Sequence, residues 1–410
     1  MFNFASQRLP ETAQACPWCR AWGKFPGRCP EGSPRNARPP PSPQDSDLPM
    51  TADRQRDLML IINPISGTGS KKGVAQAVTE RLAEAGWRVD ARTTAARGDA
   101  TRLAAEAVSR GYYGVLACGG DGTVNETARA LCGTPVALGI LPAGSGNGLA
   151  RHVGVPMDID LALDVIEADN VVASDYGTVN GRPFFCTFGL GFDAAVSHRF
   201  ARQNHRGLLS YIRSCVSEYV KYRPQTYTVS ANGKLLTEKA FLIAVCNASQ
   251  WGNNAYIAPQ ASITDGLLDI TIVHSGSPID TAVMGMDIFT GYINKNTMVH
   301  SFRAPAAVIY RNAVGEAHID GEPMMMDNIL DIKCHHGRLL IFTPDSRQSF
   351  KPIITPVREM VKDVRLGLHH LFSRHILKHF DSDEELSDTF EERSDRRAAR
   401  IWEEDDDDDR

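Results

Sequence analysis

The 410-residue sequence contains no run of about 18 consecutive apolar residues, the length that a membrane-spanning helix requires. It does not begin with the basic start and apolar stretch of a secretory signal. The nine cysteines follow no spacing that indicates a disulfide framework, although Cys16 and Cys19 resemble half of a metal site. We therefore expect a soluble, cytoplasmic protein with reduced thiols.

The sequence also lacks a basic stripe with interleaved aromatic residues, so we do not expect it to bind nucleic acid. Its formal net charge is −5, but residues 381–410 hold 15 Asp and Glu against five Arg, a net charge of −10. The other residues therefore carry about +5, the difference between those two charges. The acidic tail is expected to be disordered and solvated.

Composition divides the rest of the chain into four segments. Residues 1–56 hold ten of the 23 prolines and are predicted to be disordered. Translation from Met50, just before the first predicted strand, is an alternative hypothesis. The remaining segments are an α/β domain, a β-rich domain and a basic amphipathic helix, at residues 57–174, 175–350 and 351–380.

The α/β domain is predicted to be a doubly wound parallel sheet, because short apolar runs alternate with amphipathic segments. Its strands are expected at 58–62, 88–93, 114–118 and 136–141, and its helices at 72–85, 99–110, from 124, and at 161–168. The second domain is expected to be mainly antiparallel, because short strands and turns follow one another. Its strands are expected at 183–189, 226–231, 239–247, 267–273, 306–311, 317–320 and 329–333, with helices at 208–222 and 281–292.

Three glycine-rich turns each follow a predicted strand of the first domain. They read Asn63-Pro-Ile-Ser-Gly67, Gly119-Gly-Asp-Gly-Thr123 and Pro142-Ala-Gly-Ser-Gly-Asn147. The carboxyl ends of parallel strands share one edge of a sheet, where ligands bind in open α/β folds. Glycine lets the backbone approach closely and turn its amides toward phosphate oxygens, and a following helix adds its positive dipole end. The turns predict a shared phosphate-binding crevice.

The common nucleotide-binding motifs are missing. Neither the P-loop nor the protein-kinase signatures occur, so a phosphate site would use another architecture. The three turns are followed by Ile319-Asp-Gly-Glu322. Together the four motifs resemble the diacylglycerol kinase catalytic family, which includes bacterial lipid kinases and sphingosine kinases, over roughly residues 57–345. The second turn alone is shared with NAD kinases and nearly with phosphofructokinases.

The resemblance implies transfer of a phosphoryl group from ATP, with Mg²⁺, to a lipid hydroxyl. It assigns to ATP the residues Asn63, Ser66, Gly67, Thr94, Gly119, Gly120, Gly122, Thr123, Asn125, Glu126, Gly144, Ser145 and Asn147. It places Asp121 near Mg²⁺ or the reacting hydroxyl, and makes Glu322 the general base. A helix cap is the alternative for Asp121. Local sequence alone favours an ordinary hairpin turn for Asp320-Gly-Glu322, and the family resemblance reverses that preference.

The resemblance also implies residues for a structural metal and for the lipid. Ser262, Asp265 and Leu267 match a loop that holds a second Mg²⁺ in some bacterial relatives, with a bare Asp-Gly turn as the alternative. Asp193 and Asp175 are assigned to the lipid substrate.

The lipid itself stays open between two classes. Gly148 lies where bacterial diacylglycerol kinases commonly have Asp, so the third turn looks closer to sphingosine kinases. The segment that ends at Asp193 resembles the bacterial form, and Ser197 lies where sphingosine kinases keep an acidic residue. We expect a diacylglycerol-like lipid at a membrane surface. A sphingoid base, a soluble substrate such as NAD, a catalytically silent module and a homodimer stay open.

Overall fold

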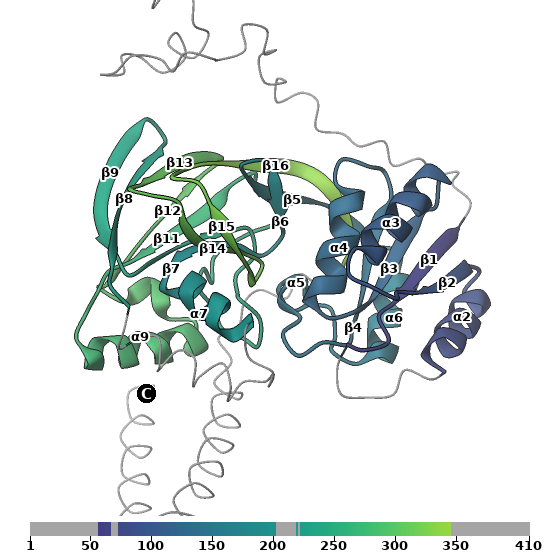
Figure 1. Ribbon diagram of the computed structural model, residues 1–410. Coiled ribbons are helices and arrows are strands. Elements are labelled where there is room, and N and C mark those ends of the chain that lie inside the picture. The colour runs from purple at the N-terminus through teal and green to yellow at the C-terminus, as the bar shows by residue number, and fades with distance from the viewer. Residues whose placement is uncertain (1–55, 67–72, 202–218, 220–221, 346–410) are drawn as a thin grey trace, which may run out of the picture. The chain divides into compact units, whose positions relative to one another are not determined.

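The computed structural model describes residues 56–66, 73–201, 219 and 222–345, which contain a first, α/β domain and a second, β-rich domain (Figure 1). Several predictions fall outside the described residues. They are the disordered N-terminal segment with Met50 and the Cys16–Cys19 pair, Gly67, the bulk of the helix at 208–222, the basic helix at 351–380 and the acidic tail.

Four parallel strands form the centre of the first domain, in the order β2-β1-β3-β4. They are β1 (Asp57–Ile62), β2 (Arg88–Thr93), β3 (Gly114–Gly119) and β4 (Ala137–Pro142). All residues of β3 and β4 are buried, which is why these strands are continuous apolar runs in the sequence. The predicted doubly wound parallel sheet is confirmed.

The helices of this domain return the chain from one strand to the next. They are α2 (Val74–Glu84), α3 (Asp99–Ser109), α4 (Asp121–Leu131), α5 (Gly148–Val153) and α6 (Ile159–Glu167). Helices α2 and α3 are followed by Gly86 and Gly111, whose φ angles of 86° and 72° are readily adopted by glycine. One expectation needs correction, because α4 begins at Asp121 rather than at 124. The helix expected after the third turn is the short α5.

The first sheet continues into the second domain through one long strand. Strand β16 (Ile329–Phe342) pairs with β13 at its start and in parallel with β4 at its end, where Ile341 lies beside Leu138. Its last four residues, 339–342, belong to the core of the α/β domain. The prediction of a five-residue strand at 329–333 was therefore too short, because the chain crosses back to complete the parallel sheet.

The antiparallel part of this sheet lies beyond β16. Its other strands are β5 (Val171–Val179), β6 (Arg182–Phe184), β8 (Gln225–Ala231), β9 (Lys234–Ala240) and β13 (Ala306–Arg311). Strand β5 was not predicted, and it spans the boundary expected between residues 174 and 175. The predicted hairpin at Asn232-Gly233 is confirmed, because both residues have positive φ (52° and 71°) between β8 and β9.

A second sheet packs against this antiparallel part. Its order is β12-β11-β10-β7-β14-β15, and its neighbouring strands pair antiparallel. The strands are β7 (Thr187–Gly191), β10 (Leu242–Cys246), β11 (Leu268–Val273), β12 (Val299–Ala304), β14 (Gly315–Ile319) and β15 (Glu322–Met326). Buried side chains such as Phe188 and Ile309 come from different sheets and share one core, so this domain is a β-sandwich.

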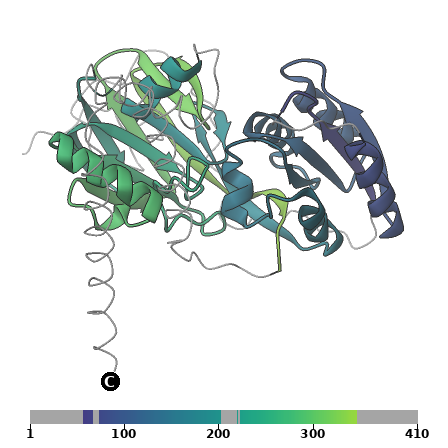
Figure 2. The same cartoon turned by 90° about the horizontal axis from the view of Figure 1, so that it is seen from below.

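Helices complete the second domain. They are α7 (Phe192–Ala201), α9 (Pro278–Thr290) and the short 3₁₀ helix η2 (Ile293–Lys295). Helix α9 begins with a capping box between Ser277 and Asp280, and Figure 2 shows it lying over the strands of this domain. Among the described residues, no helix has the length and apolar character needed to cross a membrane.

Candidate functional site

The first turn is tied to the second by side-chain hydrogen bonds. Asn63, which follows β1, donates from Nδ2 to Thr123 Oγ1 at 3.1 Å. Ser66 Oγ donates to the Asn63 carbonyl at 3.1 Å, and the Thr94 amide donates to Ile62 O at 2.9 Å. The predicted nucleotide residues Asn63, Ser66, Thr94 and Thr123 therefore lie together at the carboxyl ends of β1, β2 and β3.

The second and third turns touch each other through their glycines. A Cβ atom on residue 144 would lie 2.4 Å from Gly120 Cα, which is closer than Cβ atoms approach non-bonded atoms in proteins. The Ala143 amide also donates to Gly119 O at 2.8 Å. Backbone packing therefore requires glycine at position 144, independently of any phosphate. Gly122 and Ser145 are exposed.

Asp121 lies at the start of α4, and both of its carboxylate oxygens accept backbone N–H groups. Oδ2 accepts from Asn147 at 2.8 Å and Oδ1 from Gly148 at 2.7 Å, at the beginning of α5. The predicted capping geometry is present, although the capped helix is α5 rather than the one that Asp121 begins. The role of Asp121 beside Mg²⁺ or the hydroxyl stays a prediction.

The rest of α4 joins the second turn to the segment after β2. Glu126 Oε1 accepts the Gly98 N–H at 2.9 Å, and the Glu126 carbonyl accepts the Thr101 hydroxyl at 2.8 Å. Asn125 is buried in the same helix. Two further predicted nucleotide residues, Asn125 and Glu126, thus lie on α4, and Glu126 contacts the segment after β2.

Glu322 begins β15, directly after a tight turn. Asp320 and Gly321 both have positive φ (49° and 79°), so the hairpin geometry read from local sequence is present. The turn directs Glu322 toward the α/β domain, because Glu322 Oε2 lies 2.8 Å from Arg97 Nη2 and 3.5 Å from Arg129 Nη2. The hairpin and a functional carboxylate are therefore compatible.

Asp320 was not among the predicted site residues, yet it anchors this turn. Its carboxylate accepts the N–H groups of Phe185, Cys186 and Thr187 at 2.8–2.9 Å. Burial of the carboxylate raises the pKa of Asp320 to about 6, while these three N–H groups and His318 act in the opposite direction. The signal in the sequence was the Asp-Gly pair, which favours positive φ.

Asp193, assigned to the lipid, is buried against a histidine. Its Oδ2 lies 3.0 Å from His318 Nε2, and both side chains are about 5% exposed or less. His318 Nδ1 in turn accepts the Gly321 N–H at 3.3 Å, so this pair supports the Glu322 turn. A Cβ at Gly189 would stand 2.1 Å from His318 Nε2, which explains this glycine. The role of Asp193 toward a lipid stays a prediction.

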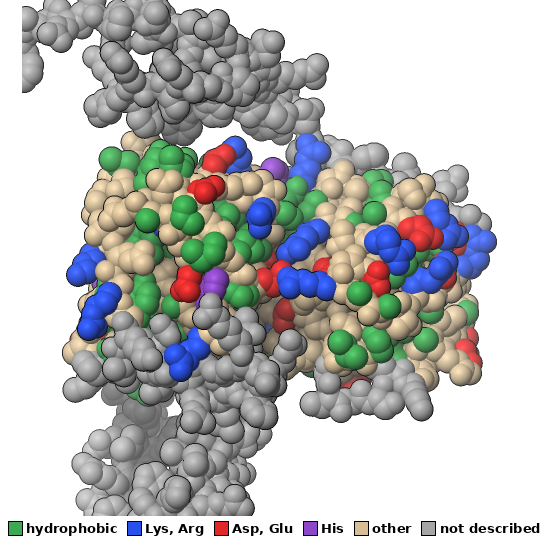
Figure 3. All heavy atoms as spheres, in the orientation of Figure 1, with side chains coloured by type: hydrophobic (Ala, Val, Ile, Leu, Met, Phe, Trp, Pro, Cys, Tyr) green, Lys and Arg blue, Asp and Glu red, His purple; other side chains and the backbone are tan. Residues whose placement is uncertain are grey.

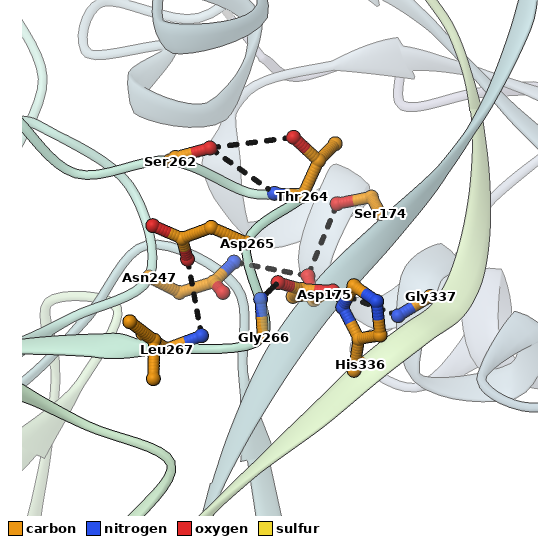
Figure 4. A network of polar contacts seen from close by, with 10 residues as sticks. All are labelled: Ser174, Asp175, Asn247, Ser262, Thr264, Asp265, Gly266, Leu267, His336 and Gly337. Carbon is orange, nitrogen blue, oxygen red and sulfur yellow. Dashed lines mark hydrogen bonds and ion pairs between the residues drawn. The ribbon is translucent and has the colours of Figure 1, made fainter. Parts of the chain in front are cut away.

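Asp175, also assigned to the lipid, is completely buried between two backbone segments (Figure 4). Its carboxylate accepts N–H groups from Gly266 and Gly337 at 2.7 Å each, and lies 2.8 Å from His336 Nδ1. Gly337 lies in the irregularity at which β16 changes register with β5. Asp175 therefore joins this irregularity to the predicted metal loop, and its role toward a lipid also stays a prediction.

The predicted metal loop has its carboxylate partly engaged. Asp265 Oδ1 accepts the Leu267 N–H at 3.0 Å, and Oδ2 lies 3.5 Å from Arg303 Nη1. Ser262 Oγ lies 3.3 Å from the Thr264 hydroxyl (Figure 4). Among the described residues, no group of three or more His, Cys, Asp or Glu could hold a metal ion. The loop supplies one carboxylate and backbone carbonyls, which are the hard oxygens that Mg²⁺ prefers.

The second domain also supports the third turn, which sequence reasoning missed. His152 Nδ1 lies 2.9 Å from Ser249 Oγ and accepts the Ser249 N–H at 3.1 Å. Gly252 packs its backbone against Gly146, where a Cβ would stand 3.2 Å from Gly146 Cα. Burial lowers the pKa of His152 to about 4, so its ring is neutral near pH 7. No motif marks these contacts, because they join distant segments.

Comparison with family descriptions covers both domains. Residues 57–179 match the diacylglycerol kinase catalytic domain, and residues 187–338 match the YegS C-terminal NAD kinase β-sandwich-like domain. A crystal structure of a diacylglycerol kinase from Bacillus anthracis is similar, with a TM-score of 0.56 and 22% identity, covering 71% of this chain and 97% of that one. This likeness shows the shared fold.

The matched region covers most of the length of three relatives. A diacylglycerol kinase of Mycobacterium tuberculosis is 31% identical over 247 residues, which are 56% of this chain and 77% of the relative. The diacylglycerol kinase of Bacillus subtilis is 28% identical, with 64% and 88% covered. A Pseudomonas fluorescens protein named "Probable lipid kinase YegS-like" is 28% identical, with 71% and 96% covered. The chain therefore belongs to the diacylglycerol kinase family and is a lipid kinase.

Proposed function

We propose that this lipid kinase transfers the γ-phosphoryl group of ATP to the hydroxyl of diacylglycerol or a related lipid, giving a phosphatidate-type product. The observation that carries the proposal is the position of Glu322, on a hairpin of the second domain but directed toward Arg97 and Arg129 of the α/β domain. A carboxylate facing a glycine-lined edge of the sheet is the arrangement that such a transfer needs. The relatives named diacylglycerol kinase support this lipid class.

The three turns would bind the nucleotide. Gly120 and Gly144 lie backbone to backbone, and Gly122 is exposed in the first turn of α4. The amides of Thr123 and Val124 donate to the Gly120 carbonyl, whereas an α-helix offers no carbonyl to the amides of its first two residues, here Asp121 and Gly122, at its positive dipole end. Phosphate oxygens would therefore bind at the start of α4, with Asn63 and Thr94 beside them.

Glu322 would act as the general base. The lipid hydroxyl oxygen attacks the γ-phosphorus, the bond to the bridging oxygen of ADP breaks, and the hydroxyl proton passes to the Glu322 carboxylate. Mg²⁺, when bound, neutralises charge on the phosphates. Asp121 would be its carboxylate partner at the turn, and the loop from Ser262 to Leu267 would hold a second, structural Mg²⁺ through Asp265.

The proposed substrate lies in a membrane, so the enzyme would work at the membrane surface. We propose a cytoplasmic, peripherally associated protein in phospholipid biosynthesis. The basic helix predicted at 351–380 is the candidate contact for anionic lipid. Sedimentation of the full chain with vesicles of phosphatidylglycerol and phosphatidylcholine tests this, and equal binding to neutral vesicles would contradict an electrostatic contact.

The function is tested by transfer of labelled phosphate from ATP and Mg²⁺ to diacylglycerol, sphingosine and NAD in parallel reactions. We expect labelled product with diacylglycerol and its loss with EDTA. Asp121→Asn and Glu322→Gln should lower turnover by roughly a hundredfold or more, a usual scale for general-base loss. Asp331→Asn, at an exposed carboxylate of β16, is the matched control and should retain activity. Product with sphingosine or NAD alone would replace the proposed substrate.

A further inference from the structure

Glu322 is engaged by two guanidinium groups in this structure. Its Oε2 lies 2.8 Å from Arg97 Nη2 and 3.5 Å from Arg129 Nη2. The Glu322 side chain is 29% exposed and that of Arg97 is 78% exposed, so the pair is accessible to a dissolved ligand. Both guanidinium groups approach the same carboxylate oxygen, so this oxygen is already engaged by two charged partners. The structure therefore holds the proposed base in a paired state.

Both arginines come from the nucleotide-binding side of the molecule. Arg97 lies in the segment after β2 and directly precedes Gly98, which donates its N–H to Glu126. Arg129 lies three residues after Glu126 on α4, a spacing that places both on one face of the helix. In the space-filling view of Figure 3, basic (blue) and acidic (red) side chains lie next to one another near the centre, where the two domains meet.

Other arginines of the α/β domain pair within that domain. Arg88, the first residue of β2, has its Nε 2.5 Å from Asp57 Oδ1, and Arg92 has its Nε 2.8 Å from Asp90 Oδ1. Arg97 and Arg129 instead reach a carboxylate of the second domain. Guanidinium groups bind phosphate in a bidentate geometry, and a phosphate group carries more negative charge than a carboxylate. A nucleotide in the crevice would therefore compete with Glu322 for Arg97 and Arg129.

We propose that the γ-phosphate of bound ATP takes the place of Glu322 on Arg97 and Arg129, which frees the carboxylate for the lipid hydroxyl. No covalent bond changes in this step, because one ion pair is exchanged for another. The exchange makes Arg97 and Arg129 ligands of the transferred group and ties activation of the base to nucleotide binding. It rests on the proposed kinase function.

The test measures binding of ADP and of the non-hydrolysable analogue AMP-PNP, each with Mg²⁺, to the full chain by calorimetry. Arg97→Ala and Arg129→Ala should each weaken AMP-PNP by about tenfold and ADP by less than about twofold, because ADP has no γ-phosphate. Arg97→Lys should restore part of the loss. Glu322→Gln should strengthen AMP-PNP binding several-fold, since it removes the competing charge. Arg88→Ala is the matched control and should bind both as the wild type does.

The outcomes separate this inference from the function on which it rests. Equal losses for both nucleotides, unchanged AMP-PNP binding in the alanine variants, or weaker AMP-PNP binding in Glu322→Gln would overturn the exchange while leaving a kinase. Failure of the wild-type chain to bind either nucleotide would overturn both the exchange and the proposed kinase function. Unfolding curves of each variant exclude loss of fold as the cause, and Arg97→Lys retains the charge where Arg97→Ala is unstable.

Discussion

Glycines carry the motifs of the α/β domain, whereas carboxylates carry those of the β-rich domain. In the first domain, Gly120 and Gly144 meet backbone to backbone at the edge where a nucleotide would bind. In the second, Asp175 and Asp320 are held by two and three N–H groups respectively and stabilise loops. Glu322 differs from them, because its described partners are arginine side chains. Within the β-rich domain, Glu322 is thus the motif carboxylate that remains for chemistry, since backbone N–H groups hold Asp175 and Asp320.

The largest effect on stability is expected from Asp320→Ala. The variant leaves the buried N–H groups of Phe185, Cys186 and Thr187 without their acceptor, at roughly 1–3 kcal/mol each. We expect the free energy of unfolding in urea to fall by about 3–5 kcal/mol. Asp331→Ala, at an exposed carboxylate, should change it by less than about 0.5 kcal/mol. Equal effects would remove Asp320 from the residues that stabilise the fold.

The glycines of the first domain can be divided into those needed for packing and those needed for ligand approach. Gly144→Ala should destabilise the fold by about 1–3 kcal/mol, because the new Cβ would meet Gly120 Cα at 2.4 Å. Gly122→Ala meets no atom within 4 Å and should fold normally, yet weaken ATP binding at the start of α4. Urea unfolding and ATP titration separate the two. Unchanged ATP binding in Gly122→Ala would contradict close approach of the phosphate there.

The contact between the domains at His152 should make stability depend on pH. Its pKa in the folded protein is about 4, below the ordinary value of 6.5, so protonation favours the unfolded chain. Its contribution is complete above about pH 6.5 and is lost as the pH falls toward 4. After allowance for partial exposure, this amounts to about 2 kcal/mol.

This pH dependence is measured as the difference in unfolding free energy between the wild type and His152→Asn. Asparagine can still accept the Ser249 N–H but does not titrate, so the difference should shrink by about 2 kcal/mol from pH 7 to pH 4. A constant difference for His152→Asn would mean that His152 does not titrate in this range.

The smallest effect is expected from the metal loop. If Asp265 holds Mg²⁺, millimolar MgCl₂ should raise the melting temperature by a few degrees through binding to the folded state. Asp265→Ala should abolish that rise. Arg303 already lies 3.5 Å from Asp265 Oδ2, so Arg303→Gln should strengthen the effect of Mg²⁺. A rise that persists in Asp265→Ala would place the ion elsewhere.

Local sequence patterns predicted the four parallel strands of the α/β domain, because β1, β3 and β4 are buried apolar runs and glycine or proline turns bound them. Strand β2 was predicted with its observed bounds, as was β13 in the second domain. Patterns failed where pairing decides the structure. Strand β5 was not foreseen, and β16 is far longer than its apolar start suggests, since it continues past β13 and pairs with β5 from Ile332 to Phe342, across one irregularity.

Local periodicity and the order of short motifs were enough to predict the family, the parallel sheet and the identity of the motif residues. The contacts of those residues became known only from the folded chain. Asp121 caps α5, Asp175 and Asp320 hold loops, and Glu322 reaches Arg97 and Arg129. These contacts join residues that are distant in the chain. Their geometry follows from the packing of two domains through β16, which no local pattern encodes.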